Sequence, residues 1–120
     1  MSKLMDKVRE AESLNREMMA LARTNDADAQ LEILRLRSRF SRLVVDMLNE
    51  RSSDPVLSGN SALAERFDEL FREVRSALSA HQGAWHPRAI ESDPSGYRQS
   101  AATVNEKQVA FYSWCSQSLA

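Results

Sequence analysis

Apolar side chains recur along the chain in four stretches at steps of three and four residues, the spacing that gathers them on one face of an α-helix. The four stripes begin at Leu4, Ala29, Leu63 and Tyr97. Between them lie short polar segments in which the periodicity is lost. The pattern therefore predicts four helices, over residues about 3–23, 28–50, 61–83 and 94–117.

Capping and breaking residues mark the ends of these stretches. Asn25 predicts the end of the first helix, and Asp26 or Asp28 predicts the N-cap of the second. Segment 51–60 contains Pro55, Gly59 and several capping residues, so we expect a loop there. The third helix is expected to begin at Asn60 or Ser61 and to end before Pro87, and the fourth to begin at the pair Asp93 and Pro94.

Four helices of similar length, each with one apolar face and joined by short connections, are typical of a bundle. The fold class predicted is all-α, an antiparallel up-down-up-down four-helix bundle that forms a single domain over residues 1–120. Four apolar residues on the first two helices lie beside the stripes rather than on them: Met5, Met19, Val45 and Leu48. They predict either a wider core or a homodimer that uses these helices.

Charge and composition narrow the classes of partner. The chain has 16 basic and 17 acidic residues, which leaves no net field to attract nucleic acid or an anionic membrane. Its apolar runs are about five residues long, against roughly 20 needed to span a bilayer, and its N-terminus has no signal-peptide core. The lone Cys115 cannot form an internal disulfide. We expect no nucleic-acid or membrane partner and a reducing, cytoplasmic location.

The most informative polar residue is His81, because it lies on the apolar stripe of the third helix. A buried imidazole must be hydrogen-bonded or ligated, and an ordinary polar neighbour is the favoured interpretation. Trp85 follows one turn later, and Tyr97 opens the stripe of the fourth helix, so the three residues are candidates to line an internal cavity. His86 is five residues from His81 and cannot share a metal with it on one regular helix. No cofactor or metal is expected, and His81 is the one weak candidate ligand.

The four-helix pattern, the segments 14–18 and 43–50, and His81 with Trp85 together resemble a hemerythrin-like cation-binding domain. In that family, histidines on the first two helices and carboxylates beyond them hold an oxygen-bridged di-iron centre. The corresponding positions here look like Asn15 and Met47, and only His81 matches a ligand. The resemblance implies the fold far more than iron binding, and it describes a derivative that has lost the metal site.

The sequence carries no nucleophile elbow, phosphate-binding loop, zinc-protease motif or paired-cysteine motif, so no enzymatic activity is expected. Arg35, Arg39 and Arg42 form a basic ridge on the second helix and are candidates to dock an acidic protein partner. The leading hypothesis is a non-catalytic helical bundle that acts through protein–protein contacts, with a regulatory role as one form of it. The alternative is a metal- or small-ligand-binding bundle that uses the core histidine.

Overall fold

The computed structural model describes residues 2–24 and 26–119, and every secondary-structure element in these residues is a helix. Four helices are long: α1 (Lys3–Thr24), α2 (Ala27–Arg51), α4 (Ser61–Ala84) and α6 (Pro94–Ser118). Two are short: α3 (Pro55–Ser58) and α5 (Pro87–Ser92). The all-α class predicted from the sequence is confirmed.

The long helices begin and end within one residue of the predicted positions, because the predicted caps are formed. Asp26 accepts a hydrogen bond from the backbone N–H of Ala29 at 2.8 Å, which fixes the start of α2. Asn60 and Asp93 cap α4 and α6 in the same way. The stop expected at Asn25 lies outside the described residues.

The two short helices occupy segments that the sequence predicted to be loops. The Asp54 carboxylate accepts from the N–H of Leu57 at 3.1 Å, and Pro55 supplies the first helical position of α3. His86 acts likewise for α5, since its Nδ1 accepts from the N–H of Ala89 at 3.3 Å. A cap followed by proline is enough to close one helical turn, even where the segment is too short to show a hydrophobic period.

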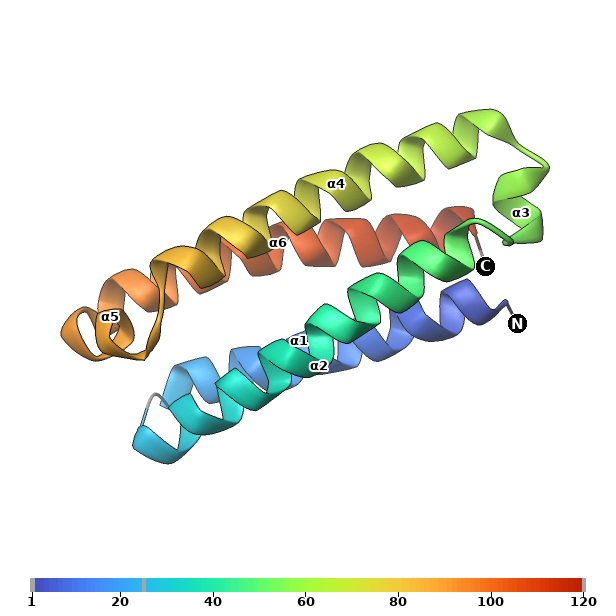
Figure 1. Ribbon diagram of the computed structural model, residues 1–120. Helices are drawn as coiled ribbons and strands as arrows, with labels where there is room; N and C mark the ends of the chain where they lie inside the picture. The colour runs from blue at the N-terminus through green and yellow to red at the C-terminus, as the bar shows by residue number, and fades with distance from the viewer. Residues whose placement is uncertain (1, 25, 120) are drawn as a thin grey trace.

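The molecule is elongated, with principal extents of 48, 20 and 19 Å. Figure 1 shows the four long helices running along its length, with both termini at the end that carries α3 and with α5 at the opposite end. Among the described residues, extended backbone packing joins α1 to α2, α1 to α6, and α4 to α6. Within the described residues no comparable packing joins α2 to α4, and a groove lies between these two helices.

The core is apolar and contains a cluster of aromatic rings on α4 and α6. Phe71 stacks on Phe111 with ring centroids 5.4 Å apart, and Phe67 packs against both. Met5 is only 1% exposed, so it widens this core, whereas Val45 is 55% exposed. A second, smaller apolar cluster lies towards α5 and is formed by Ala22, Ile33, Ile90 and Tyr97.

A relay of buried amides fixes α1 against α6. The Tyr112 hydroxyl donates to Gln108 Oε1 at 2.7 Å, and Gln108 Nε2 donates to Asn15 Oδ1 at 2.9 Å. Asn15 Nδ2 then donates to Asn105 Oδ1 at 2.7 Å. Because hydrogen bonds need particular donor and acceptor positions, this relay favours one register of the two helices. The sequence pattern did not identify Tyr112 as a member of this relay.

Candidate functional site

His81 lies on the inner side of α4 and makes the polar contact expected of a core imidazole. Its Nδ1 is 2.7 Å from Ser100 Oγ on α6, and its ring stacks on Tyr97 with centroids 5.6 Å apart. Burial, and to a smaller extent the positive charge of Arg37, lower the pKa of His81 to about 4. The imidazole is therefore neutral at physiological pH, with one ring nitrogen engaged by Ser100.

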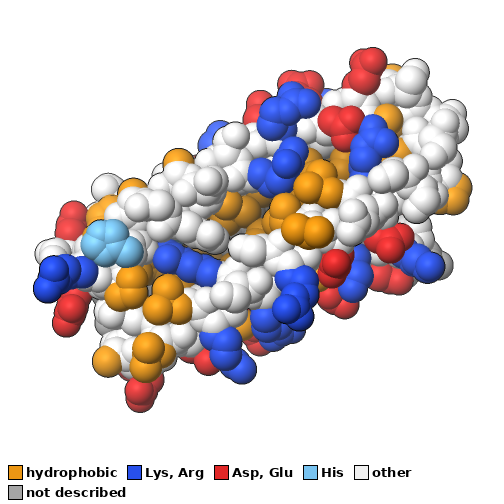
Figure 2. All heavy atoms as spheres, viewed as in Figure 1, with side chains coloured by type: hydrophobic (Ala, Val, Ile, Leu, Met, Phe, Trp, Pro, Cys, Tyr) orange, Lys and Arg blue, Asp and Glu red, His pale blue; other side chains and the backbone are white. Residues whose placement is uncertain are grey.

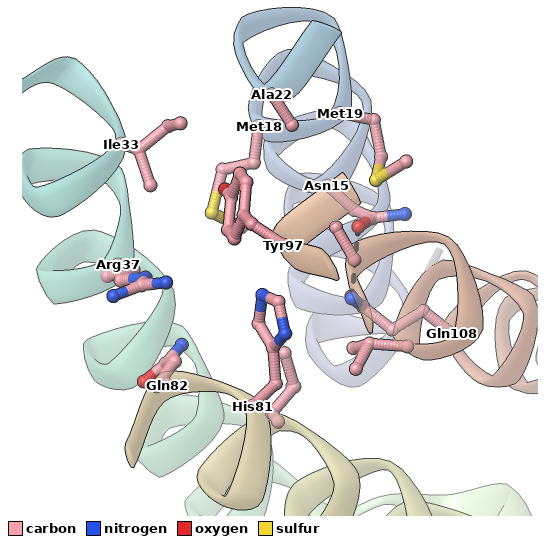
Figure 3. Close-up of a pocket in the computed structure, with 13 residues that line it drawn as sticks. Asn15, Met18, Met19, Ala22, Ile33, Arg37, His81, Gln82, Tyr97 and Gln108 are labelled. Atoms are coloured by element: carbon pink, nitrogen blue, oxygen red, sulfur yellow. Dashed lines mark hydrogen bonds between the residues drawn. The ribbon is translucent and has the colours of Figure 1, made fainter. Parts of the chain in front are cut away.

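A small pocket of about 40 Å³ lies beside this ring, between α1, α2, α4 and α6 (Figure 3). His81 and Tyr97, two of the three residues named as cavity candidates, both line it. Trp85, the third cavity candidate, does not line it. The indole instead packs against the Tyr97 ring in an edge-to-face arrangement, with ring centroids 6.0 Å apart.

The charged group at this pocket is Arg37 on α2, which the sequence analysis did not select. Arg37 Nη1 donates to the backbone carbonyl of Trp85 at 3.0 Å, and this contact ties α2 to the end of α4. Arg37 Nη2 is buried and has no hydrogen-bond partner in the part of the chain that the structure describes. Burial lowers the pKa of Arg37. One sequence feature could have identified it, since Arg37 lies one helical turn after the buried Ile33 and off the exposed basic ridge.

The predicted docking ridge of Arg35, Arg39 and Arg42 is exposed on α2 and lies apart from the pocket. Arg35 pairs with Glu32 on its own helix, and this contact raises the pKa of Arg35 and lowers that of Glu32. The structure therefore does not bring the ridge together with His81, Trp85 and Tyr97.

The opening between α2 and α4 holds a groove of about 240 Å³. Its apolar lining comes from Phe40, Val44 and Leu78. Figure 2 shows hydrophobic side chains in a hollow between the two helices, with Lys and Arg side chains on both sides. The polar residues that line the groove are Ser41, Arg75, Ser79 and Gln82. Gln82 and Leu78 also line the His81 pocket, so the two features are neighbours.

Arginine dominates the electrostatics of this groove. The Arg75 guanidinium lies 5.0 Å from the centre of the Phe71 ring, and its Nε is buried with no hydrogen-bond partner among the described residues. At one end, Arg51 donates two hydrogen bonds to the Asp68 carboxylate, at 2.7 and 2.8 Å. Arg51 lowers the pKa of Asp68 most, and Arg72 and Arg75 lower it further. Arg75 is the one charged residue among those that line the groove.

The described residues do not assemble a metal centre. No group of three His, Cys, Asp or Glu side chains among them is placed to hold an ion. The two positions that the hemerythrin resemblance aligned with histidine ligands are occupied otherwise: Asn15 belongs to the amide relay, and Met47 is 1% exposed in the core. Cys115 is buried, and burial raises the pKa of its thiol to about 12.

In the described residues, no helix has both the length and the apolar character that crossing a bilayer requires. No family model, curated protein or solved structure matches the chain. The geometry of the groove and the pocket is therefore the basis for the function proposed below.

Proposed function

We propose that the protein is a non-catalytic interaction module whose α2–α4 groove binds an amphipathic helix with acidic flanks from a partner protein. The observation that carries this proposal is the arginine of the groove with an unsatisfied donor: Arg75 Nε is buried beside Phe71 without a partner. Removing a donor from water without a hydrogen bond costs about 1–3 kcal/mol. The guanidinium of Arg75 is the one charged group among the residues that line the groove, so it favours an acidic side chain of the partner.

The chemistry of the partner follows from the groove lining. Phe40, Val44 and Leu78 offer an apolar strip that suits the apolar face of a helix, which presents side chains at steps of three and four. Arg75 lines the groove from α4, and its charge lowers the pKa of Asp68. A helix with Asp or Glu flanking its apolar face matches both features, and a basic helix would be repelled.

The wider architecture belongs to the same proposal. We infer that the four long helices form an antiparallel up-down-up-down bundle, one domain over residues 1–120, opened along α2 and α4. The matching helix lengths and the position of both termini at the α3 end support this arrangement (Figure 1). The buried lone thiol of Cys115 suits a reducing compartment such as the cytoplasm. The hemerythrin resemblance contributes to this proposal only as a likeness of fold.

A homodimer is the competing use of the same surface. Val45 and Leu48 on α2 are 55% and 38% exposed, and they offer apolar area to a second copy. We favour a separate partner because a second copy would bring the same arginines to the groove if it docked through that face, and like charges facing each other oppose association.

The test selects the partner chemistry directly. A displayed library of helical peptides of about 18 residues, five turns, keeps leucine on one face and randomises the flanks among Asp, Glu, Lys, Arg and Ala. Selection on the wild-type protein is expected to enrich Asp and Glu. Binding is then measured with Ser79→Glu, which adds a negative charge in the groove, and with Ser76→Glu, an exposed serine on the same helix outside it.

Ser79→Glu is expected to weaken binding about tenfold or more, while Ser76→Glu leaves it within about twofold. The proposal fails if no helical peptide is selected, if the selected flanks are basic, or if the two serine variants bind alike. It also fails if the protein sediments as a dimer that Ser79→Glu dissociates, because the groove would then belong to a second copy.

A further inference from the structure

The pocket beside His81 has a charged end and an apolar end (Figure 3). Arg37 and Gln82 lie on one side, and Met18, Ala22 and Ile33 lie on another. A pocket that joins one cation to a short apolar wall is complementary to a ligand with the opposite pair of features, an anionic head and a short apolar tail.

The charge at this pocket is uncompensated among the described residues. Arg37 makes no salt bridge with a described carboxylate, and its one hydrogen bond goes to the neutral backbone carbonyl of Trp85. Gln82 is uncharged, and His81 faces the pocket as a neutral ring. A buried guanidinium N–H with no partner is matched best by a carboxylate, whose planar oxygens suit the geometry of the guanidinium group.

We propose that this pocket binds a free short-chain monocarboxylic acid, with its carboxylate towards the Arg37 guanidinium and its tail towards Met18 and Ile33. This inference rests on Arg37 and the pocket alone, and it holds whether or not a helix docks in the α2–α4 groove. The site differs from the metal site that the hemerythrin resemblance implied, because it uses arginine and a neutral imidazole instead of metal ligands.

The size of the pocket restricts the ligand. A volume of about 40 Å³ corresponds to the space for about three water molecules, which a molecule such as acetate or propionate can replace. A ligand of about four non-hydrogen atoms binds at best with a Kd near 0.05 mM. We therefore expect a Kd between that limit and a few millimolar, since one charge-assisted contact and a short tail carry the affinity.

The experiment titrates sodium acetate into isotopically labelled protein at neutral pH and constant ionic strength, and follows the NMR signals of the Trp85 indole and the Met18 methyl. Acetamide serves as the matched neutral probe, because it has a similar shape without the charge. Arg37→Gln removes the guanidinium, and Arg39→Gln removes an exposed arginine from the same helix as the control. Arg37→Lys keeps the charge and provides a second variant should Arg37→Gln loosen α2 from Trp85.

The expected result is saturable binding of acetate by the wild type and by Arg39→Gln, binding about tenfold or more weaker in Arg37→Gln, and no saturation with acetamide. A nuclear Overhauser contact between the acetate methyl and Met18 is expected as well. The proposal is overturned if acetate does not saturate, if acetamide acts like acetate, or if Arg37→Gln and Arg37→Lys both bind as the wild type does.

One further arm separates a free acid from a side-chain carboxylate of a docked helix. Acetate bound in the pocket is expected to leave the affinity for a groove-binding acidic peptide unchanged. Competition between the two would assign the Arg37 pocket to the carboxylate of the partner, and the free-acid proposal would be wrong. Failure of every peptide to bind would instead refute the groove and leave the acetate result intact.

Discussion

Replacing Gln108 by leucine tests whether the buried amide relay holds α1 against α6. Gln108 is 2% exposed, and it both accepts from the Tyr112 hydroxyl and donates to Asn15 Oδ1. Leucine is close to glutamine in size, but its side chain can neither accept nor donate a hydrogen bond. The substitution therefore leaves two buried polar groups without partners and disturbs the packing little.

The magnitude follows from those two groups. Each buried donor or acceptor left without a partner costs about 1–3 kcal/mol, so the pair costs about 4 kcal/mol. The apolar leucine side chain returns about 1.5 kcal/mol by burial. Gln108→Leu is thus expected to lower the free energy of unfolding by about 2–3 kcal/mol, which a domain with a stability of about 5–15 kcal/mol survives.

The assay is urea unfolding followed by far-UV circular dichroism. Gln99→Leu is the matched control, because Gln99 is an exposed glutamine on the same helix, and it is expected to change stability by less than about 0.5 kcal/mol. The triple variant Asn15→Leu, Gln108→Leu, Tyr112→Phe removes donors and acceptors together. It is expected to be more stable than the sum of its single changes predicts, because fewer groups are left unpartnered.

Two results would refute this reasoning. A loss of less than about 1 kcal/mol in Gln108→Leu would mean that Asn15 and Tyr112 find other partners or water. A triple variant that equals the sum of its three single variants would mean that these residues do not act as one network.

Three further predictions concern single residues. Gly83→Ala is expected to raise the free energy of unfolding by about 0.5–1 kcal/mol, because a Cβ at this position meets no atom within 4 Å. Gly96→Ala is expected to lower it, because a Cβ there would stand 2.9 Å from the Trp85 ring. Thermal unfolding measures both changes. The ring of His81 is expected to titrate in NMR with a pKa near 4, and the stability that it contributes is lost as pH falls from 6.5 to 4, since the unfolded chain takes up the proton first. A stability that does not change over this range would contradict the assignment. The thiol of Cys115 is expected to react with iodoacetamide far more slowly in the folded than in the urea-unfolded protein, and equal rates would show that it is accessible.

The helices were predictable from the sequence because their signals are local. A stripe of apolar residues or a capping residue can be recognised from a few neighbouring positions, as with Asp26, Asn60 and Asp93. The observed helix ends agree with the predicted ends within one residue. The helix α3 escaped prediction because four residues are too few to show a period. Tyr112 escaped because it sits at the edge of its stripe, where the pattern does not decide between core and surface.

The candidate site was predictable only in part. His81 and Tyr97 were found because an imidazole or a phenol on an apolar stripe is conspicuous. Arg37 was missed, since its burial arises from the end of α4 folding over it, a contact 48 residues away in the chain. The groove was missed because it also depends on contacts between distant segments. A hydrophobic period of 3.6 residues shows that each helix has an apolar face, but it does not show which two helices leave a groove between them.

The most direct test of the central proposal is where an acidic amphipathic peptide binds. Methyl NMR of the labelled protein follows Val44 and Leu78 in the groove, with Val109, an exposed valine on α6, as the internal control. We predict that a leucine- and glutamate-rich helical peptide shifts the Val44 and Leu78 methyl signals and leaves Val109 unchanged. Shifts confined to Val109 or spread over all methyl groups, with Val44 and Leu78 no more affected than the rest, would contradict it.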